Sequence, residues 1–162
     1  GGVFYRQVRG GRDGKDFRLF KFRSMASGAD KKGLITVGAK DSRVTRVGYF
    51  LRKYKLDELP QLLNVVRGEM SLVGPRPEVR KYVDMYTVEQ HKVLAVVPGI
   101  TDYASIEYAD ENTILGQASD PDRAYVEQIM PDKIRYNMKY INNRCLKEYF
   151  KIIFLTLMKI VK

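Results

Sequence analysis

The 162-residue chain contains few of the residues that build disulfides and Cys/His metal sites. Cys145 is its one cysteine and His91 its one histidine, so an internal disulfide and a Cys/His metal cluster are both excluded. A single cysteine is typical of a protein in a reducing compartment. The sequence also lacks a run of about 18 apolar residues, so it contains no segment that could span a bilayer as a helix.

Three common catalytic motifs are absent as well. The chain has no glycine-rich phosphate loop of the P-loop type, no Rossmann fingerprint and no HExxH sequence. Any metal must therefore be a hard cation such as Mg²⁺, held by carboxylate oxygens and by phosphate oxygens of a substrate. An apolar fraction of 44% and a charged fraction of 30% are typical of one globular domain at this length.

The formal charge of +10 is unevenly distributed. Residues 1–56 hold 15 Lys/Arg against 4 Asp/Glu, whereas residues 57–162 hold 14 against 15. All of the excess positive charge therefore precedes Asp57. Such a basic segment attracts polyanions, which include nucleic acid, an anionic membrane surface and a phosphorylated substrate.

The first 25 residues predict a β-hairpin. Two alternating segments within 3–25 flank a turn rich in glycine and aspartate, which is the pattern of two antiparallel strands. In the second strand Phe20 and Phe22 share one face, and Lys21 and Arg23 share the other. The hairpin is therefore expected to present a cationic face.

The rest of the chain predicts mainly helices. Residues 26–40 lack periodicity and predict a mobile loop, whereas apolar residues at spacings of three and four predict a helix over 44–54. A second helix is expected to begin near Asp57 and to end at Gly68. Further elements are expected as follows: helices over 77–97, over 122–130 and from 132, and a long loop over 101–122.

The C-terminal stretch 146–162 is apolar on most sides, with lysines along one edge. As a helix it would be about 25 Å long. One interpretation places it in a membrane interface, with its lysines toward the headgroups. The other packs it on the core as an ordinary terminal helix. The sequence leaves both open.

Two short motifs carry the strongest chemical signal. Asp57 and Glu58 are adjacent, and about 18 residues later Arg76 stands between Pro75 and Pro77. A carboxylate pair can supply a nucleophile or a metal ligand, and an arginine fixed by prolines can hold a phosphate. Structural interpretations remain open, because Asp57 could be a helix N-cap and the prolines could bound a turn.

Basic residues are candidates to surround this acidic pair. They either lower the pKa of a nucleophilic carboxylate and bind a pyrophosphate, or form a solvated face. The candidates are Lys21, Arg23, Arg43, Arg46, Arg52 and Lys53.

Together the motifs resemble those of the bacterial sugar transferases. These are small monotopic phosphoglycosyl transferases, also called undecaprenyl-phosphate sugar phosphotransferases, which begin undecaprenyl-linked glycan assembly. The segments that carry the resemblance are Phe4-Tyr5-Arg6-Gln7, Phe20 to Met25, Asp41 to Gly48, Leu56 to Val65, Met70 to Pro77 and Pro98-Gly99-Ile100-Thr101. The resemblance covers residues 3–101 and continues weakly to the end.

The resemblance implies a covalent mechanism. Asp57 would attack the β-phosphate of a UDP-sugar and expel UMP, and a polyprenyl (undecaprenyl) phosphate would then accept the phosphosugar. Mg²⁺ would bridge Asp57 and the pyrophosphate. Glu58 would orient or activate the acceptor phosphate. Arg76 would hold the nucleotide-sugar, with Lys21 and Arg52 nearby.

The resemblance also implies a place for the chain in the cell. It predicts an α+β fold, namely a helix-rich single domain with a short N-terminal β-hairpin and membrane-facing amphipathic helices. Residues 1–162 would be one catalytic domain on the cytoplasmic face of the bacterial inner membrane. The resemblance implies that the family's re-entrant membrane helix would precede Gly1, which agrees with a chain that opens without an initiator methionine.

Three positions depart from the family pattern. Lys55 stands where members commonly have serine, which adds charge beside Asp57. Asn137 stands where an aspartate is common. Residues 102–109 replace the common sequence Gly-Trp-Ala-Gln-Val-Asn-Gly-Arg. This last departure falls in the predicted loop that would meet the sugar, so the sugar itself is not predicted.

A basic nucleic-acid-binding module is the alternative function. The charge block and the aromatic hairpin favour it, but the chain has no recognised RNA- or DNA-binding motif. It also leaves the acidic pair and the proline-flanked Arg76 unexplained. A membrane-bound scaffold without catalysis is a third possibility, against which the presence of both Asp57 and Glu58 argues.

Overall fold

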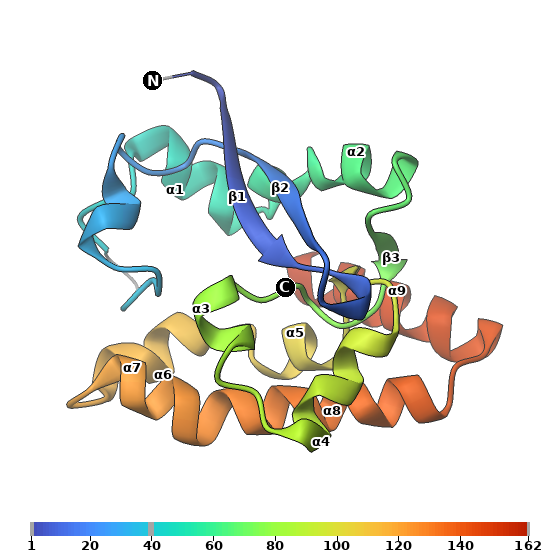
Figure 1. Cartoon of the computed structure of the whole chain (residues 1–162). Helices are drawn as coiled ribbons and strands as arrows, with labels where there is room; N and C mark the ends of the chain where they lie inside the picture. The colour runs from blue at the N-terminus through green and yellow to red at the C-terminus, as the bar shows by residue number, and fades with distance from the viewer. Residues whose placement is uncertain (1, 39–40, 162) are drawn as a thin grey trace.

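The computed structural model describes residues 2–38 and 41–161. It begins with an antiparallel hairpin of β1 (Phe4–Gly10) and β2 (Asp16–Phe22), in which Phe4 pairs with Phe22 and Gly10 with Asp16. The short 3₁₀ turn η1 (Arg12–Gly14) joins the strands. The predicted hairpin is confirmed, and Figure 1 shows it in blue, with α1 and α2 beside it and α8 on the far side of the molecule.

The segment after the hairpin leads into the first helix. A 3₁₀ turn, η2 (Ala29–Lys32), lies within the predicted loop 26–40, whose last two residues are outside the described part of the chain. Helix α1 (Arg46–Lys53) confirms the helix expected over 44–54. Its Thr45 cap accepts a hydrogen bond from the Gly48 nitrogen at 2.9 Å.

Close backbone packing fixes the start of α1 against the end of the hairpin. A Cβ atom at Gly48 would lie 1.8 Å from the Ser24 carbonyl oxygen, which no side chain can tolerate. The same oxygen accepts a hydrogen bond from the Thr45 nitrogen at 3.0 Å. Glycine at this position therefore lets α1 sit directly on the strand that carries Lys21.

Next come the 3₁₀ turn η3 (Leu56–Glu58) and the helix α2 (Gln61–Val66). Pro60 occupies the N-cap of α2 and makes no side-chain cap. The alternative that Asp57 caps this helix is therefore wrong, because Asp57 lies within the separate turn η3. The helix itself confirms the helical part of the prediction for 57–68.

Helix α2 carries its polar side chains inward and its apolar ones outward. Gln61 and Asn64 are 1% and 0% exposed, whereas Val66 is 87% exposed and Leu62 and Leu63 are about half exposed. This arrangement inverts the usual pattern of a surface helix. The apolar stripe that predicted the helix therefore faces away from the core.

The Asn64 side chain makes three hydrogen bonds, two of which join α2 to the hairpin. Its Oδ1 accepts from the Phe20 nitrogen at 3.1 Å, and its Nδ2 donates to the Arg18 oxygen at 2.9 Å and to Glu69 Oε2 at 2.7 Å. The amide thereby satisfies backbone groups of β2 that would otherwise be buried without partners. This bond set fixes β2 relative to η3 and α2.

A short parallel pair of strands follows. In β3 (Ser71–Val73) and β4 (Gly99–Thr101), Ser71 pairs with Gly99 and Val73 with Thr101. A Cβ atom at Gly99 would lie 2.1 Å from the Gly74 nitrogen, so the two chains approach where only glycine fits. The proline-flanked arginine leaves the sheet directly after β3.

The C-terminal half is helical and contains most of the core. Its elements are α3 (Arg80–Val83), α4 (Val88–His91), the 3₁₀ turn η4 (Lys92–Ala95), α5 (Tyr103–Glu107), α6 (Glu111–Gln117), α7 (Pro121–Ala124), the π-helical turn η5 (Tyr125–Ile129), α8 (Met130–Asn142) and α9 (Leu146–Val161). One buried cluster consists of Tyr82, Leu115, Tyr125, Ile129, Met130 and Ile134. A second joins β3, α8 and α9 through Val73, Tyr140 and Ile152.

Two predictions in this half are wrong in detail. The single helix expected over 77–97 is broken, because Thr87 and Gln90 form a capping box that begins a new helix. The long loop expected over 101–122 contains α5 and α6. Asp102 starts α5 by accepting a hydrogen bond from the Ser105 nitrogen at 2.6 Å.

Helix α9 packs on the core with one side only. Ile152 is fully buried and Thr156 Oγ1 lies 2.7 Å from Thr101 Oγ1, whereas Phe150, Phe154 and Leu157 are more than half exposed. The core-packing alternative is therefore confirmed for the inner face, and an apolar outer face remains. Among the helices of residues 2–38 and 41–161, none is long and apolar enough to cross a membrane.

Replacing Asn64 with alanine should destabilise the fold. The change leaves two backbone groups of β2 buried without partners, and we expect a loss of about 3 kcal/mol in the free energy of unfolding. The exposed Asn143, whose Nδ2 donates to the Lys139 oxygen at 2.9 Å, is the control, and Asn143→Ala should change stability by less than about 0.5 kcal/mol. Urea unfolding measures both, and equal losses would contradict the role of Asn64 in joining α2 to the hairpin.

Candidate active site

A cleft of about 800 Å³ opens between the hairpin, α1, η3 and the α5–α6 segment. It brings together most of the residues predicted from the sequence, although they come from four separate segments. The predicted residues that line it are Lys21, Arg23, Arg43, Arg52, Asp57, Glu58 and Arg76. Pro75 and Pro77 line a smaller cavity behind Arg76 instead.

Glu58 is bound by two cations within the cleft. Both of its oxygens accept from the Arg76 guanidinium, with Nη1 3.1 Å from Oε2 and Nη2 on Oε1, and Lys21 Nζ lies 3.3 Å from Oε1. Burial would by itself raise the pKa of Glu58, but the charges of Arg76 and Lys21 outweigh it and hold the pKa well below its usual range. Glu58 is therefore a fixed anion.

Arg76 is held from behind as well as by Glu58. Its backbone nitrogen donates to Asp102 Oδ2 at 3.0 Å, and its Nη1 also donates to the Ile100 oxygen at 3.2 Å. Pro75 accepts a hydrogen bond from the Gly99 nitrogen at 2.9 Å. The proline-flanked segment is thus a turn beside the parallel strands, and it also holds the Arg76 guanidinium in a fixed position.

Asp102 is a residue that the sequence reasoning missed. It is fully buried and bonds the backbone of both Arg76 and Ser105. Its position before a short helix is a signal for an N-cap, but that helix was expected to be a loop. Asp102 therefore positions Arg76 and α5 together, and α5 lines the cleft.

Asp57 lies beside Glu58, but the cations Lys21 and Arg76 pair with Glu58 and not with Asp57. Its side chain is 7% exposed and lines the cleft, yet no hydrogen bond or ion pair of its carboxylate is formed within the described part of the chain. Burial raises the pKa of Asp57, and the charge of Lys21 opposes the rise. Of the two carboxylates, Asp57 is the one that remains available to a ligand.

Lys21 contributes a titratable cation next to both acids. Burial lowers the pKa of its ammonium to about 8, against the attraction of Glu58. An anionic ligand in the cleft would raise this pKa again, because it adds negative charge nearby. Lys21 is therefore placed to respond to the binding of a phosphate.

The other predicted basic residues have different surroundings. Arg43 binds Asp41 and donates to the carbonyl oxygens of Gly33 and Ile35, both at 2.6 Å. Hydrogen bonds from Arg43 lower the pKa of Asp41 to about 2. Arg43 thus fixes the loop at the rim of the cleft. The structure places its guanidinium on protein groups rather than toward Asp57.

Arg23 and Arg52 differ from each other in how many protein groups their guanidinium groups bind. Arg23 donates to the carbonyl oxygens of Gly2 and Phe4, at 2.8 and 3.2 Å, and so holds the start of β1. Within residues 2–38 and 41–161, the Arg52 side chain makes one hydrogen bond, from Nη2 to Thr36 Oγ1 at 3.0 Å. Arg52 therefore keeps most of its donors for a ligand.

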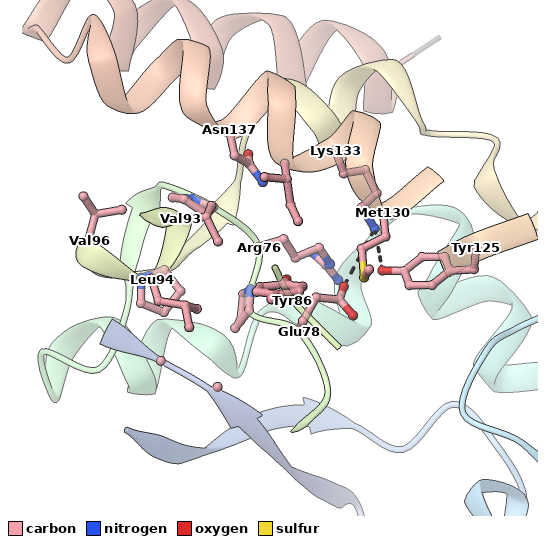
Figure 2. A pocket seen from close by; sticks show the side chains of 16 residues that line it. Arg76, Glu78, Tyr86, Val93, Leu94, Val96, Tyr125, Met130, Lys133 and Asn137 are labelled. Carbon is pink, nitrogen blue, oxygen red and sulfur yellow. Dashed lines mark hydrogen bonds and ion pairs between the residues drawn. The ribbon is translucent and has the colours of Figure 1, made fainter. Parts of the chain in front are cut away.

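A second polar cluster lies behind Arg76, as Figure 2 shows. Lys133 Nζ is 3.9 Å from Glu78 Oε1, 3.0 Å from Glu111 Oε2 and 3.4 Å from the Tyr125 hydroxyl. These residues come from segments far apart in the sequence, so no spacing pattern could have predicted them. The cluster joins α6 and α8 to the segment that carries Arg76.

A small cavity of about 20 Å³ adjoins this cluster and has room for about one water molecule. Asn137 lines it, and its Oδ1 has no hydrogen-bond partner among the described residues. The asparagine that departs from the family pattern therefore faces a small, mainly apolar cavity behind Arg76 (Figure 2) and not the large cleft.

Replacing Arg76 with glutamine should destabilise the protein and change its acid sensitivity. Glu58 would keep only Lys21 as a partner, and we expect a loss of about 3 kcal/mol in the free energy of unfolding. The wild-type pair contributes stability above a pH of about 4.5 that is lost as the pH falls, because Glu58 is deprotonated more readily in the folded state. In Arg76→Gln the pKa of Glu58 rises toward or above its unfolded value, so less stability should be lost as the pH falls below about 4.5.

Thermal unfolding between pH 3 and pH 8 would measure both effects. Arg80→Gln is the matched control, because Arg80 pairs with Asp84 and Asp16 on the exposed surface, where such pairs contribute little. If both variants lose the same stability with the same pH profile, the Glu58–Arg76 pair does not stabilise the fold more than an exposed ion pair does.

Known relatives match nearly the whole chain or about two thirds of it. A protein of Aeromonas hydrophila named UDP-N-acetylgalactosamine-undecaprenyl-phosphate N-acetylgalactosaminephosphotransferase is 38% identical over 99% of the chain and 36% of its own length. A UDP-glucose:undecaprenyl-phosphate glucose-1-phosphate transferase of Klebsiella pneumoniae is 39% identical over 98% of the chain and 32% of its own length. The uncharacterized sugar transferase EpsL of Bacillus subtilis is 48% identical over 64% of the chain and 50% of its own length.

The chain therefore spans about a third to a half of the length of these relatives. The family model described as bacterial sugar transferase matches residues 1–162. The family model thus covers the whole chain, and two relatives above 35% identity match nearly all of it. These matches agree with the resemblance that the acidic pair and Arg76 suggested. The chain belongs to the bacterial sugar transferase family.

Proposed function

We propose that this protein transfers a phosphosugar from a UDP-sugar to a polyprenyl phosphate such as undecaprenyl phosphate and releases UMP. One observation carries the proposal: the cleft holds two adjacent carboxylates, of which Glu58 is bound by two cations and Asp57 is free to react. The printed names of two relatives, which are UDP-sugar and undecaprenyl-phosphate transferases, support the substrate classes.

The reaction proceeds in two displacements at one phosphorus atom. A carboxylate oxygen of Asp57 forms a bond to the β-phosphorus of the UDP-sugar, the bond from this phosphorus to the bridging oxygen breaks, and UMP leaves with the electron pair. An oxygen of the polyprenyl phosphate then attacks the same phosphorus and releases the Asp57 carboxylate. Covalent catalysis of this kind divides one difficult transfer into two easier ones.

The surrounding residues prepare the cleft for phosphate. Lys21 and Arg76 carry positive charge beside Asp57 and are fixed in position by Glu58, so they need little reorganisation when a pyrophosphate enters. Glu58 keeps these cations oriented and, in this proposal, places the acceptor phosphate through them. Arg52 adds donors from α1.

Mg²⁺ is part of the proposal, with Asp57 as its protein ligand. The described residues include no group of three or more His, Cys, Asp or Glu side chains that could hold a metal ion. Mg²⁺ does not need such a group, because it commonly binds one or two carboxylates together with substrate phosphates. When bound, it would neutralise charge on the pyrophosphate and the leaving group.

The outer surface fits a protein that rests on a membrane. The apolar residues of α1 and α2 are exposed, among them Val47, Phe50 and Val66, and α9 adds Phe150 and Phe154. The excess positive charge lies in the same N-terminal part of the chain. We therefore place the protein on the cytoplasmic face of the bacterial inner membrane, where anionic lipids attract basic surfaces.

The nucleic-acid-binding alternative does not explain why Lys21 and Arg76 pair with Glu58 in the cleft. Lys21 and Arg76 lie within the cleft, where both pair with Glu58, whereas nucleic acid is bound by a basic patch or stripe on one face of a protein. Binding of nucleic acid is therefore not part of the proposal.

Release of UMP tests the function. The full-length protein with Mg²⁺, undecaprenyl phosphate and a panel of UDP-sugars should release UMP with at least one of them. Asp57→Asn should reduce kcat by about a thousandfold or more, because the amide cannot act as the nucleophile. Glu89→Gln is the control, because Glu89 is exposed and lies outside the cleft. Turnover by Asp57→Asn at the wild-type rate would contradict the assigned nucleophile.

The pH dependence of kcat/KM tests the role of Lys21. The protonated ammonium is the form that attracts a phosphate, and its pKa is about 8 in the free protein, so kcat/KM should fall about tenfold per pH unit above that value. Arginine stays charged in this range. Lys21→Arg should therefore keep its activity up to higher pH, and an identical alkaline decline in both proteins would contradict the role.

A further inference from the structure

Lys55 has an unusual backbone conformation. Among the described residues, Asp13 and Lys55 are the two non-glycine residues with positive φ, and Lys55 lies at φ 55° and ψ 17°. Aspartate tolerates this left-handed conformation in a hairpin turn, but a lysine has no such local help. A left-handed lysine next to a reactive pair therefore needs a reason.

Backbone hydrogen bonds explain the left-handed conformation of Lys55, but they do not explain why the residue is a lysine. The Lys55 nitrogen donates to the Arg52 oxygen and its oxygen accepts from the Glu58 nitrogen, both at 3.2 Å. Lys55 thereby ends α1 and begins the turn that carries Asp57. Glycine or asparagine would provide this geometry with less strain.

Two simpler explanations for a lysine do not suffice. A cation near the end of a helix interacts favourably with the helix dipole, but Arg52 and Lys53 already occupy the last turn of α1. An ion pair within the protein is the other explanation. Within the described ranges no carboxylate lies within ion-pairing distance of Lys55, whereas Lys21 and Arg76 are both paired with Glu58.

The position of Lys55 suggests what the side chain does. Lys55 lines the same cleft as Asp57 and Glu58. Lys55 stands two residues before Asp57, and its backbone oxygen accepts the hydrogen bond from the Glu58 nitrogen in the turn that carries both acids. A cation without an ion-pair partner among the described residues is thus held at the cleft beside the free carboxylate.

We propose that Lys55 is a positioning residue whose ammonium group binds a phosphate oxygen of the reacting groups beside Asp57. The inference rests on the proposed function and adds a specific residue to it. Lys21 and Arg76 share their charge with Glu58, so a further cation without such a partner adds positive charge for the incoming phosphate. The phosphate can belong to the pyrophosphate of the UDP-sugar or to the polyprenyl acceptor.

Replacement by residues that accept a left-handed backbone separates this role from folding. In Lys55→Gly and Lys55→Asn the melting temperature should stay the same or rise, while the KM for one substrate rises about tenfold at low salt. The difference should shrink at high salt, because salt screens exposed charges. Lys55→Arg should restore most of the loss. A higher KM for the UDP-sugar alone identifies the pyrophosphate as the ligand, and a higher KM for the acceptor alone identifies the acceptor phosphate.

Lys92→Gln is the matched control. It removes the same charge from the exposed surface outside the cleft, where Lys92 pairs with Glu89. The proposal is overturned if Lys55→Gly and Lys55→Asn keep both KM values within twofold of the wild type. It is also overturned if Lys92→Gln raises KM as much as they do, since the effect would then come from net charge.

A separate measurement distinguishes failure of this inference from failure of the proposed function. If the wild type releases no UMP with any UDP-sugar, the proposed function fails. Binding of inorganic pyrophosphate, measured by calorimetry, then tests Lys55 directly. Binding about tenfold weaker in Lys55→Gly than in the wild type supports the phosphate-binding role, and equal binding overturns it.

Discussion

The ion pairs of Glu58 with Arg76 and Lys21 are the interaction on which the site depends. They join the turn η3, the strand β2 and the segment after β3 at one point. A partly buried carboxylate with two cations is stable only while all the partners stay in place, because removing one leaves an uncompensated charge. The surrounding structure supplies that constraint: Asn64 fixes β2 against α2, and Asp102 fixes Arg76. One consequence is that Asp57, the neighbour of Glu58, is left without a partner among the described residues.

The two halves of the chain differ in where their apolar residues lie. The larger buried cluster belongs to the C-terminal helices, whereas α1 and α2 expose theirs and α2 buries two amides. Exposed apolar helices next to a basic N-terminal segment are costly in water and favourable at a membrane interface. In the proposed function this arrangement has a use, because the exposed apolar helices would rest on lipid while the cleft receives a soluble nucleotide-sugar and a lipid phosphate.

Local sequence signals predicted the parts of the structure that local forces determine. The hairpin and α1 follow from alternation and helical periodicity, and the spacing of Asp57, Glu58 and Arg76 was enough to suggest a phosphate site. The broken helix after Pro77 and the helix α5 were missed because capping by Thr87 and Asp102 overrides weak periodicity. Long-range partners were beyond reach as well: nothing in the sequence places Lys133 beside Glu78, or directs Arg43 to the loop carbonyls rather than to the cleft.

The central claim is that Asp57 is the carboxylate that reacts because Glu58 is already bound. Intact mass spectrometry of the full-length protein tests it most directly, after incubation with Mg²⁺ and a UDP-sugar in the absence of a lipid acceptor. We expect a mass gain of one phosphosugar that maps to the peptide containing Asp57 and disappears when polyprenyl phosphate is added. A protein that releases UMP only when polyprenyl phosphate is present, and never gains mass, would contradict the claim and indicate direct transfer between the two substrates.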